Sequence, residues 1–106
     1  MGFLTLNDLE GREIVPGFRA KFVHSENMTL AYWEVDPDAS LPEHSHPHEQ
    51  IANVLDGRFE LTVDGETRIL EPGMVAVIPG GIPHGGKALT SCRLLDAFHP
   101  SREDYR

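Results

Sequence analysis

Residues 44–50 read HSHPHEQ and residues 79–86 read PGGIPHGG, and these two stretches hold four of the six histidines of the 106-residue chain. Four side chains of the first stretch occupy alternate positions, namely His44, His46, His48 and Gln50. In an extended strand such side chains project to one face. Three imidazoles and an amide on one face are hard to explain as structure alone, because buried polar groups need hydrogen-bond partners. Neutral imidazole is a common transition-metal ligand, so the pattern indicates a metal site.

The second stretch supplies a histidine from a different part of the chain. His84 follows Pro79-Gly80-Gly81, and glycine permits close backbone approach and sharp changes of direction. We therefore expect His84 to come from a second strand and to complete the ligand set.

Short segments rich in β-branched and aromatic residues lie between closely spaced turn signals. The expected strands cover residues 30–35, 51–55, 58–63, 67–70, 74–78 and 92–98. Asp64-Gly65 separates two of them and is a strong signal for a two-residue hairpin. This spacing predicts an all-β sandwich or barrel, with a single domain over residues 1–106. Helix is expected to be at most a turn or two, in the tail at residues 101–106.

The charge balance argues against several classes of partner. Nine Lys and Arg stand against seventeen Asp and Glu, which gives a formal net charge of −8. Such a balance opposes attraction to nucleic-acid phosphates and anionic membrane surfaces. There is also no 18-residue apolar run, so no membrane span is expected.

The N-terminus and the single cysteine indicate a cytoplasmic protein. The first 13 residues, MGFLTLNDLEGRE, contain Asp8 and lack the basic start of a signal peptide. Cys92 has no intramolecular disulfide partner and lies in an apolar run, where a buried thiol is expected.

The two histidine stretches resemble the two motifs of the cupin superfamily. The first motif is His-x-His, three or four residues, Glu, six residues and Gly; here it is His44-Ser-His46, three residues, Gln50, six residues and Gly57. The second is Gly, five residues, Pro-x-Gly, two residues and His, and the segment from Gly73 to His84 matches every fixed position. The resemblance implies a single-domain cupin, a double-stranded β-helix or jelly-roll barrel. It also implies one divalent metal ion held by His44, His46, Gln50 and His84, with His48 as a pocket wall or an alternate ligand.

Three positions depart from the cupin motifs. Asp38 replaces a glycine that usually lies six residues before the first histidine, and the late Asn of the second motif is absent. Gln50 replaces the usual Glu. A neutral amide leaves more of the ion's charge uncompensated, which favours Lewis-acid chemistry over oxygen activation. The ligand set does not choose among Zn, Ni, Mn, Fe and Cu.

The last apolar segment contains an acidic residue. In LLDAF, Asp96 and Phe98 share one face of the expected strand. The periodicity leaves two interpretations open, a functional carboxyl inside the barrel or a solvent-facing one paired with Arg102 at the surface.

The stretch HSHPHEQI with a downstream LLDAFHPSRED resembles the subfamily of small cupins called pectin degradation proteins, or KdgF. The resemblance implies a non-redox enzyme that linearises 4,5-unsaturated uronates. Arg102 would then bind the substrate's carboxylate, and Asp96 would transfer protons during ring opening and tautomerisation. Phe98 would pack against the sugar as part of the pocket wall.

Other functions and the assembly stay open at the level of the sequence. The alternatives are an Mn or Fe cupin oxygenase, an isomerase of another small acid, and a non-catalytic cupin that binds a metal or a small ligand. A small-molecule anionic substrate and a homodimer are the expected partners, with residues 3–15 as a strand that could pair across the dimer.

Overall fold

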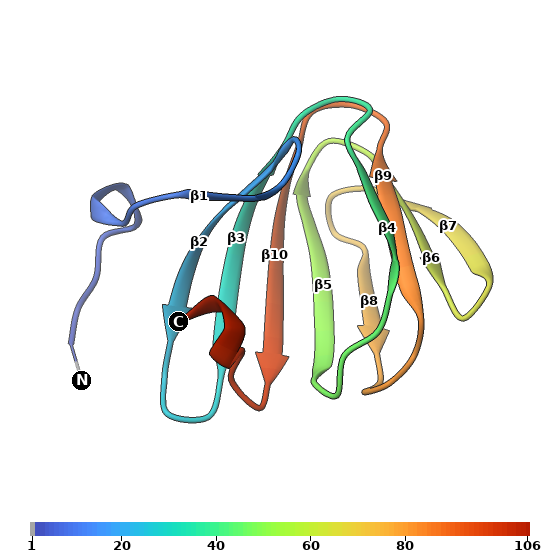
Figure 1. Cartoon of the computed structure of the whole chain (residues 1–106). Helices are drawn as coiled ribbons and strands as arrows, with labels where there is room; N and C mark the ends of the chain where they lie inside the picture. The colour runs from blue at the N-terminus through green and yellow to red at the C-terminus, as the bar shows by residue number, and fades with distance from the viewer. Residues whose placement is uncertain (1) are drawn as a thin grey trace.

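The computed structural model describes residues 2–106 as two antiparallel β-sheets that enclose a common interior (Figure 1). The ten strands are β1 (Arg12–Val15), β2 (Phe18–His24), β3 (Thr29–Val35), β4 (Ser40–His44), β5 (Glu49–Asp56), β6 (Phe59–Val63), β7 (Glu66–Leu70), β8 (Val75–Ile78), β9 (His84–Ala88) and β10 (Cys92–His99). Two 3-10 turns, η1 (Leu6–Asp8) and η2 (Glu103–Tyr105), complete the elements. The predicted all-β fold class is confirmed.

The strand order interleaves distant parts of the chain. One sheet has the order β1-β2-β3-β10-β5-β8 and the other has the order β4-β9-β6-β7. The last strand, β10, therefore lies in the middle of the larger sheet, between β3 and β5. This arrangement is the jelly-roll barrel that the sequence predicts, and it brings β10 beside the strand that follows the first histidine stretch.

All six expected strands are present within a residue or two of their predicted bounds. The hairpin at Asp64-Gly65 is also confirmed, since β6 pairs with β7 and both turn residues have positive φ. Strand β2 was not predicted, and the strands that carry His44 and His84, β4 and β9, were expected without defined bounds. Pro42 lies in β4 and Gly85-Gly86 in β9, and these residue types are depleted in strands. Gly86 is needed there, because a Cβ would overlap the ring of Phe59.

Aromatic side chains join the two sheets at one end of the barrel. Phe18 of β2 packs edge-on against Phe59 of the opposite sheet, with 6.3 Å between ring centroids. Phe18 also packs edge-on against Trp33 of β3 at 6.0 Å. All three rings are buried. This end of the interior is apolar and forms the floor beneath the candidate site.

Asp38 adopts a backbone conformation that explains the glycine of the cupin motif. Its φ is 68°, in the left-handed region where glycine is unstrained and Asp is tolerated better than most residues. The substitution therefore keeps the turn between β3 and β4.

The N-terminal segment projects away from the barrel (Figure 1). Within the expected strand at residues 3–15, only Arg12–Val15 forms a strand, and it pairs with β2 of the same chain. It is the outermost strand of the larger sheet, so within residues 2–106 its other edge has no partner strand. Among residues 2–106, no helix is long and apolar enough to cross a membrane.

Candidate metal centre and pocket

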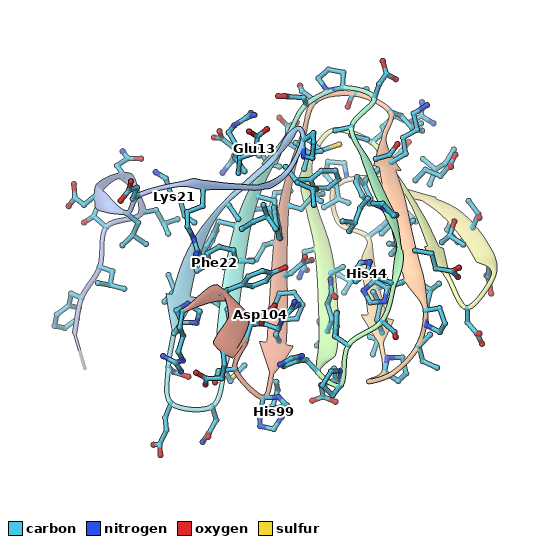
Figure 2. The ribbon with its side chains drawn as sticks, in the orientation of Figure 1. Glu13, Lys21, Phe22, His44, His99 and Asp104 are labelled. Carbon is cyan, nitrogen blue, oxygen red and sulfur yellow. The ribbon has the colours of Figure 1, made fainter. Side chains whose placement is uncertain are left out.

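A pocket opens into the barrel at the end where β4 and β10 finish and β5 and β9 begin. Figure 2 shows the His44 side chain between β4 and β5 and places Asp104 on the tail in front of β10. The polar side chains that line the pocket are His44, His46, Gln50, Asn53, His84, Asp96, Arg102 and Tyr105. The four predicted metal ligands thus lie around one cavity with Asp96, Phe98 and Arg102, whereas His48, expected as a pocket wall or an alternate ligand, is not among the lining residues.

The three histidines that line the pocket form a cluster. His44 ends β4 and is paired in register with His84, the first residue of β9. His46 reaches the same place from the bend between β4 and β5. One candidate ligand atom from each of the three lies within 4.8 Å of the others. Histidines 40 residues apart in the sequence therefore meet at one point, close enough to converge on a single ion.

The first histidine stretch is not one continuous strand. Strand β4 ends at His44, residues 45–48 bend, and β5 starts at Glu49. The expectation that His44, His46, His48 and Gln50 share one strand face is therefore wrong. The bend carries His46 inward, and Gly81 closes it by donating a backbone hydrogen bond to the carbonyl of His46 at 2.8 Å.

Backbone carbonyls orient all three imidazoles of the cluster. Nδ1 of His44 lies 2.9 Å from the carbonyl of Pro42, Nδ1 of His84 lies 2.8 Å from that of Ile82, and Nδ1 of His46 lies 3.0 Å from that of His48. A carbonyl oxygen can only accept, so each Nδ1 carries the proton. In the neutral ring, Nε2 is then left with a free lone pair. Such outer contacts are typical of metal-ligating histidines.

The buried nitrogens of the cluster fit a cation. Nε2 of His84 is buried and has no hydrogen-bond partner. Burial lowers the pKa of His84, and burial, helped by the nearby Arg102 charge, lowers the pKa of His46 to about 4. Both rings are therefore neutral at pH 7 and can donate lone pairs. An unpartnered buried acceptor is costly, and a bound metal ion would satisfy it.

Gln50 connects the histidine cluster to Asp96. Its side chain is 7% exposed, and its Oε1 lies 3.1 Å from Nε2 of His46. Both atoms are acceptors when His46 is neutral and protonated on Nδ1, so a cation between them would relieve their repulsion. The amide group of Gln50 donates a hydrogen bond to Asp96, which lowers the pKa of that carboxyl.

Asp96 is a buried carboxyl on the inner face of β10. It is 8% exposed and accepts a hydrogen bond of 3.0 Å from Nε1 of Trp33. Its partners across the sheet are Ala31 and Ala52, whose small side chains leave space in front of the carboxyl. Burial raises the pKa of Asp96 to about 7, against the opposing effect of its hydrogen bonds. The interpretation of Asp96 as a surface residue paired with Arg102 is wrong, because the carboxyl lies inside the barrel.

Arg102 lies at the edge of the pocket and has a different acidic partner. Its guanidinium carbon lies over the rings of Phe98 and Tyr105, at 4.7 and 4.2 Å from their centroids. Its Nε and Nη2 donate to the two carboxylate oxygens of Asp104 at 3.0 and 2.8 Å. The side chain of Arg102 is 9% exposed. Arg102 is thus the cationic side chain among the residues that line the pocket, and Asp104 pairs with it.

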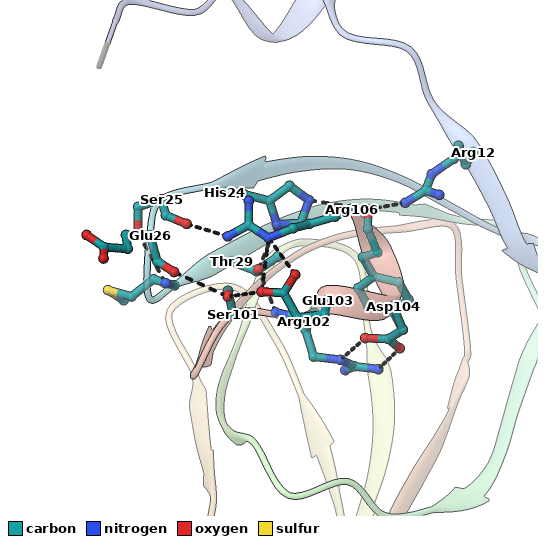
Figure 3. Close-up of polar contacts among 12 residues, drawn as sticks. Arg12, His24, Ser25, Glu26, Thr29, Ser101, Arg102, Glu103, Asp104 and Arg106 are labelled. Atoms are coloured by element: carbon teal, nitrogen blue, oxygen red, sulfur yellow. Dashed lines mark hydrogen bonds and ion pairs between the residues drawn. The ribbon is translucent and has the colours of Figure 1, made fainter.

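The C-terminal tail is fastened to the β2–β3 hairpin, as Figure 3 shows. Arg12 and His24 both bind the carbonyl of Tyr105, and Arg106 binds that of Ser25. The backbone N–H of Arg102 donates to the Thr29 hydroxyl at 2.9 Å. These contacts fix the tail across the pocket mouth.

Some residues of the site were not anticipated from the sequence. Trp33 and Tyr105 contact the predicted residues directly, and Asp104 pairs with Arg102. The inward position of Trp33 follows from the alternation of β3, but its bond to Asp96 depends on the pairing of β3 with β10. His48 lies 5.5 Å from His46, centroid to centroid, and is outside the three-histidine cluster.

Comparison with known proteins identifies the family. Residues 31–98 match the Cupin_2 family, described as a cupin domain, so the chain belongs to the cupin family. Within this family it is a homologue of KdgF. The pectin degradation protein KdgF of Dickeya dadantii is 39% identical to it over 96 residues, which are 88% of this chain and 87% of that protein.

Two further comparisons concern structure and the central motifs. The solved structure of KdgF from Halomonas sp. has a TM-score of 0.94 at 30% identity and covers 100% of this chain and 99% of that chain. The quercetin 2,3-dioxygenase of Bacillus subtilis is 54% identical over 41 residues, which are 39% of this chain and 12% of that protein. The similarity to KdgF thus extends over nearly the whole chain, whereas the similarity to the dioxygenase is confined to a short stretch.

Proposed function

We propose that this cupin is a non-redox, metal-dependent enzyme that opens and tautomerises a small sugar acid such as a 4,5-unsaturated uronate. One observation carries the proposal: a buried carboxyl with a pKa of about 7 shares one pocket with a three-histidine cluster and a buried guanidinium. A group with a pKa near neutrality both accepts and donates protons efficiently at pH 7. The similarity to KdgF over most of the chain supports the choice of substrate.

We assign the metal to His44, His46, His84 and Gln50, whose free lone pairs face one another. A divalent ion bound there would supply a Lewis acid that polarises a substrate oxygen. The neutral Gln50 leaves the ion's charge less compensated than a Glu would, which suits an anionic substrate.

The chain's own residues account for binding and proton transfer. Arg102 binds the substrate's carboxylate through its planar fork of N–H groups, and Phe98 packs against the sugar ring. Asp96 takes the proton of the anomeric hydroxyl as the C1 carbonyl forms and the bond between C1 and the ring oxygen breaks. The ring oxygen becomes an enolate oxygen on C5. Return of the proton to C4 converts the enolate to a ketone, so no oxidant or reductant is needed.

The direct test follows the ultraviolet absorbance of a 4,5-unsaturated galacturonate monomer, which disappears when the C4–C5 double bond is lost. We expect the metal-loaded protein to accelerate the decay, and the chelated protein to match the solution without protein. A reaction run in heavy water should place deuterium on C4 of the product. Consumption of dissolved oxygen by the same mixture would favour the oxygenase alternative instead.

We also propose that the protein is a cytoplasmic homodimer that associates through the outer face of the six-stranded sheet. An apolar row runs across four adjacent strands of this face, through Val77, Ile51, Ala97 and Leu30. Val77 is 72% exposed and Ile51 is 44% exposed, and contiguous exposed apolar surface marks association sites. Val77→Lys should give a monomer in analytical ultracentrifugation, whereas Ile69→Lys on the other sheet should not. A wild-type monomer at micromolar concentration would rule the dimer out.

A further inference from the structure

The ion pair between Arg102 and Asp104 has a feature that the proposed reaction does not use. Arg102 and Tyr105 line the pocket, whereas Asp104 is not among the lining residues described and its side chain is 56% exposed. Asp104 therefore contacts the guanidinium from the solvent side. Hydrogen bonds from Arg102 lower the pKa of Asp104, so its carboxylate is charged throughout the neutral range.

The surroundings of Arg102 restrict its guanidinium in two different ways. The rings of Phe98 and Tyr105, inclined at 69° to each other, contact the guanidinium and confine its position, but these contacts do not set which N–H groups face the pocket. The two bonds to Asp104 join Nε and Nη2 to one carboxylate, and such a fork fixes the in-plane angle. Rings and carboxylate together leave a single orientation.

The orientation determines which donors remain for a ligand. A guanidinium has five N–H groups, and Asp104 takes one on Nε and one on Nη2. The edge formed by Nη1 and the second N–H of Nη2 is not used by Asp104. That edge has the spacing for a second, end-on carboxylate.

We propose that Asp104 is a positioning residue that holds the guanidinium of Arg102 with its Nη1 edge toward the pocket, ready for the carboxylate of a substrate. This inference rests on the proposed role of Arg102 as the carboxylate-binding residue. Asp104 acts through Arg102 and does not contact the reacting atoms.

Two opposing effects follow from removal of the Asp104 carboxylate. The guanidinium loses its in-plane restraint, which weakens carboxylate binding, and the pocket loses a nearby negative charge, which strengthens it. The charge effect is reduced by water because Asp104 is more than half exposed. Orientation acts at hydrogen-bond distance, so the loss of orientation dominates.

Glu103 offers a matched control for the charge effect. It neighbours Asp104 in the same 3-10 turn and carries the same charge, but it binds Ser101 and Arg106 rather than Arg102. Glu103→Gln therefore removes a negative charge near the pocket mouth without touching the guanidinium.

The experiment measures affinity for galacturonate, a saturated uronate that cannot react, by calorimetry on the metal-loaded protein. Asp104→Ala should weaken binding roughly 5- to 30-fold, in the range of couplings between contacting residues. Asp104→Asn, which keeps one acceptor oxygen, should lie between Ala and wild type, and Glu103→Gln should bind at least as tightly as wild type. With the reactive uronate, KM should rise in the same order while kcat changes less. Equal or tighter binding by Asp104→Ala would overturn the inference and would show instead that Asp104 competes with the ligand.

A second measurement separates this inference from the proposed function. In proton–nitrogen spectra of the arginine Nε–H groups, assigned with Arg102→Lys, the signal of Arg102 should exchange slowly with water. Asp104→Ala should speed that exchange at least tenfold, while the tail stays docked through Arg12 and His24. Unchanged exchange would overturn the inference whether or not any uronate binds. If wild type bound no uronate, the proposed function would fall, and this exchange rate would still decide the role of Asp104.

Discussion

The two ends of the barrel interior are built on the same strands and yet differ in chemistry. On β10, Leu94 and Asp96 both point inward, two residues apart, and their exposed fractions are 9% and 8%. Leu94 faces the apolar end, where Phe18 and Phe59 pack edge-on. Asp96 faces the polar end, where Nε2 of His84 has no partner. The apolar end stabilises the fold, and the polar end contains a buried nitrogen without a protein partner, which a bound metal ion would satisfy.

The largest effect on stability is expected at the apolar end. Phe59→Ala should lower the free energy of unfolding by about 3–5 kcal/mol, since it removes a buried ring that joins the two sheets. Urea denaturation measures the loss. Ile69→Ala, on the exposed side of the neighbouring strand, is the control and should cost much less. Folded Phe59→Ala should keep its metal affinity, and a tenfold loss of that affinity would break the proposed division between the two ends.

Metal binding should offset the free-energy cost of the unpartnered nitrogen at the polar end and so stabilise the protein. At a free ion concentration 100 times its Kd, the ion should raise the free energy of unfolding by about 2.7 kcal/mol. His84→Ala should abolish that gain, because it deletes the unpartnered buried nitrogen. His99→Ala, at an exposed position outside the site (Figure 2), should keep the gain. An equal metal-induced shift in both variants would place the ion elsewhere.

Asp96 should make the metal-free protein less stable as the pH rises. Its pKa is about 7 in the folded state and 3.8 in a solvated carboxyl, so the folded state binds more protons between these values. Stability contributed by the protonated carboxyl is present at acidic pH and is lost as the pH rises through 7. Asp96→Asn lacks this loss, and its stability relative to wild type should be about 2–3 kcal/mol greater at pH 8 than at pH 5. Asp56→Asn, an exposed substitution on β5, is the control. A pH-independent difference for Asp96→Asn would show that the carboxyl ionises normally.

The histidine cluster should give a smaller slope of the opposite sign. The pKa of His46 is lowered to about 4 from 6.5, so the unfolded state binds more protons between these values. Stability of the metal-free protein should therefore fall as the pH drops from 6.5 toward 4. After allowance for partial solvent exposure, His46 should contribute about 1–2 kcal/mol of that fall. His46→Gln should flatten the acid side of the curve and His99→Gln should not; an unchanged slope in His46→Gln would contradict the assignment.

The sequence predicted most strands and the ligand types better than it predicted how these elements come together. The Asp64-Gly65 hairpin is a local signal, and the two strands that it joins formed where expected. The pairing of His44 with His84 is a long-range contact that no local period reveals. It depends on β4 and β9, whose Pro and Gly residues made the bounds of these strands unpredictable.

The polar end also shows why alternate positions in the sequence did not predict the placement of every side chain. The alternation of the first histidine stretch suggested one strand, but the chain bends between His44 and Glu49 and still delivers His46 to the same point. Asp96 could not be placed inside the barrel from its own strand, because the space in front of it is made by Ala31 and Ala52 on neighbouring strands. Asp104 was not anticipated because its partner, Arg102, was expected to face either the substrate or Asp96.

The most direct test of the central claim compares wild type with Asp96→Asn, both loaded with the same metal and checked for equal metal content. The absorbance of a 4,5-unsaturated uronate is followed over time with each protein. We predict rapid decay with wild type and a loss of at least about a hundredfold with Asp96→Asn, the typical contribution of a general acid–base group. Equal decay with both proteins would contradict the claim that Asp96 at the polar end of the barrel carries out the proton transfer.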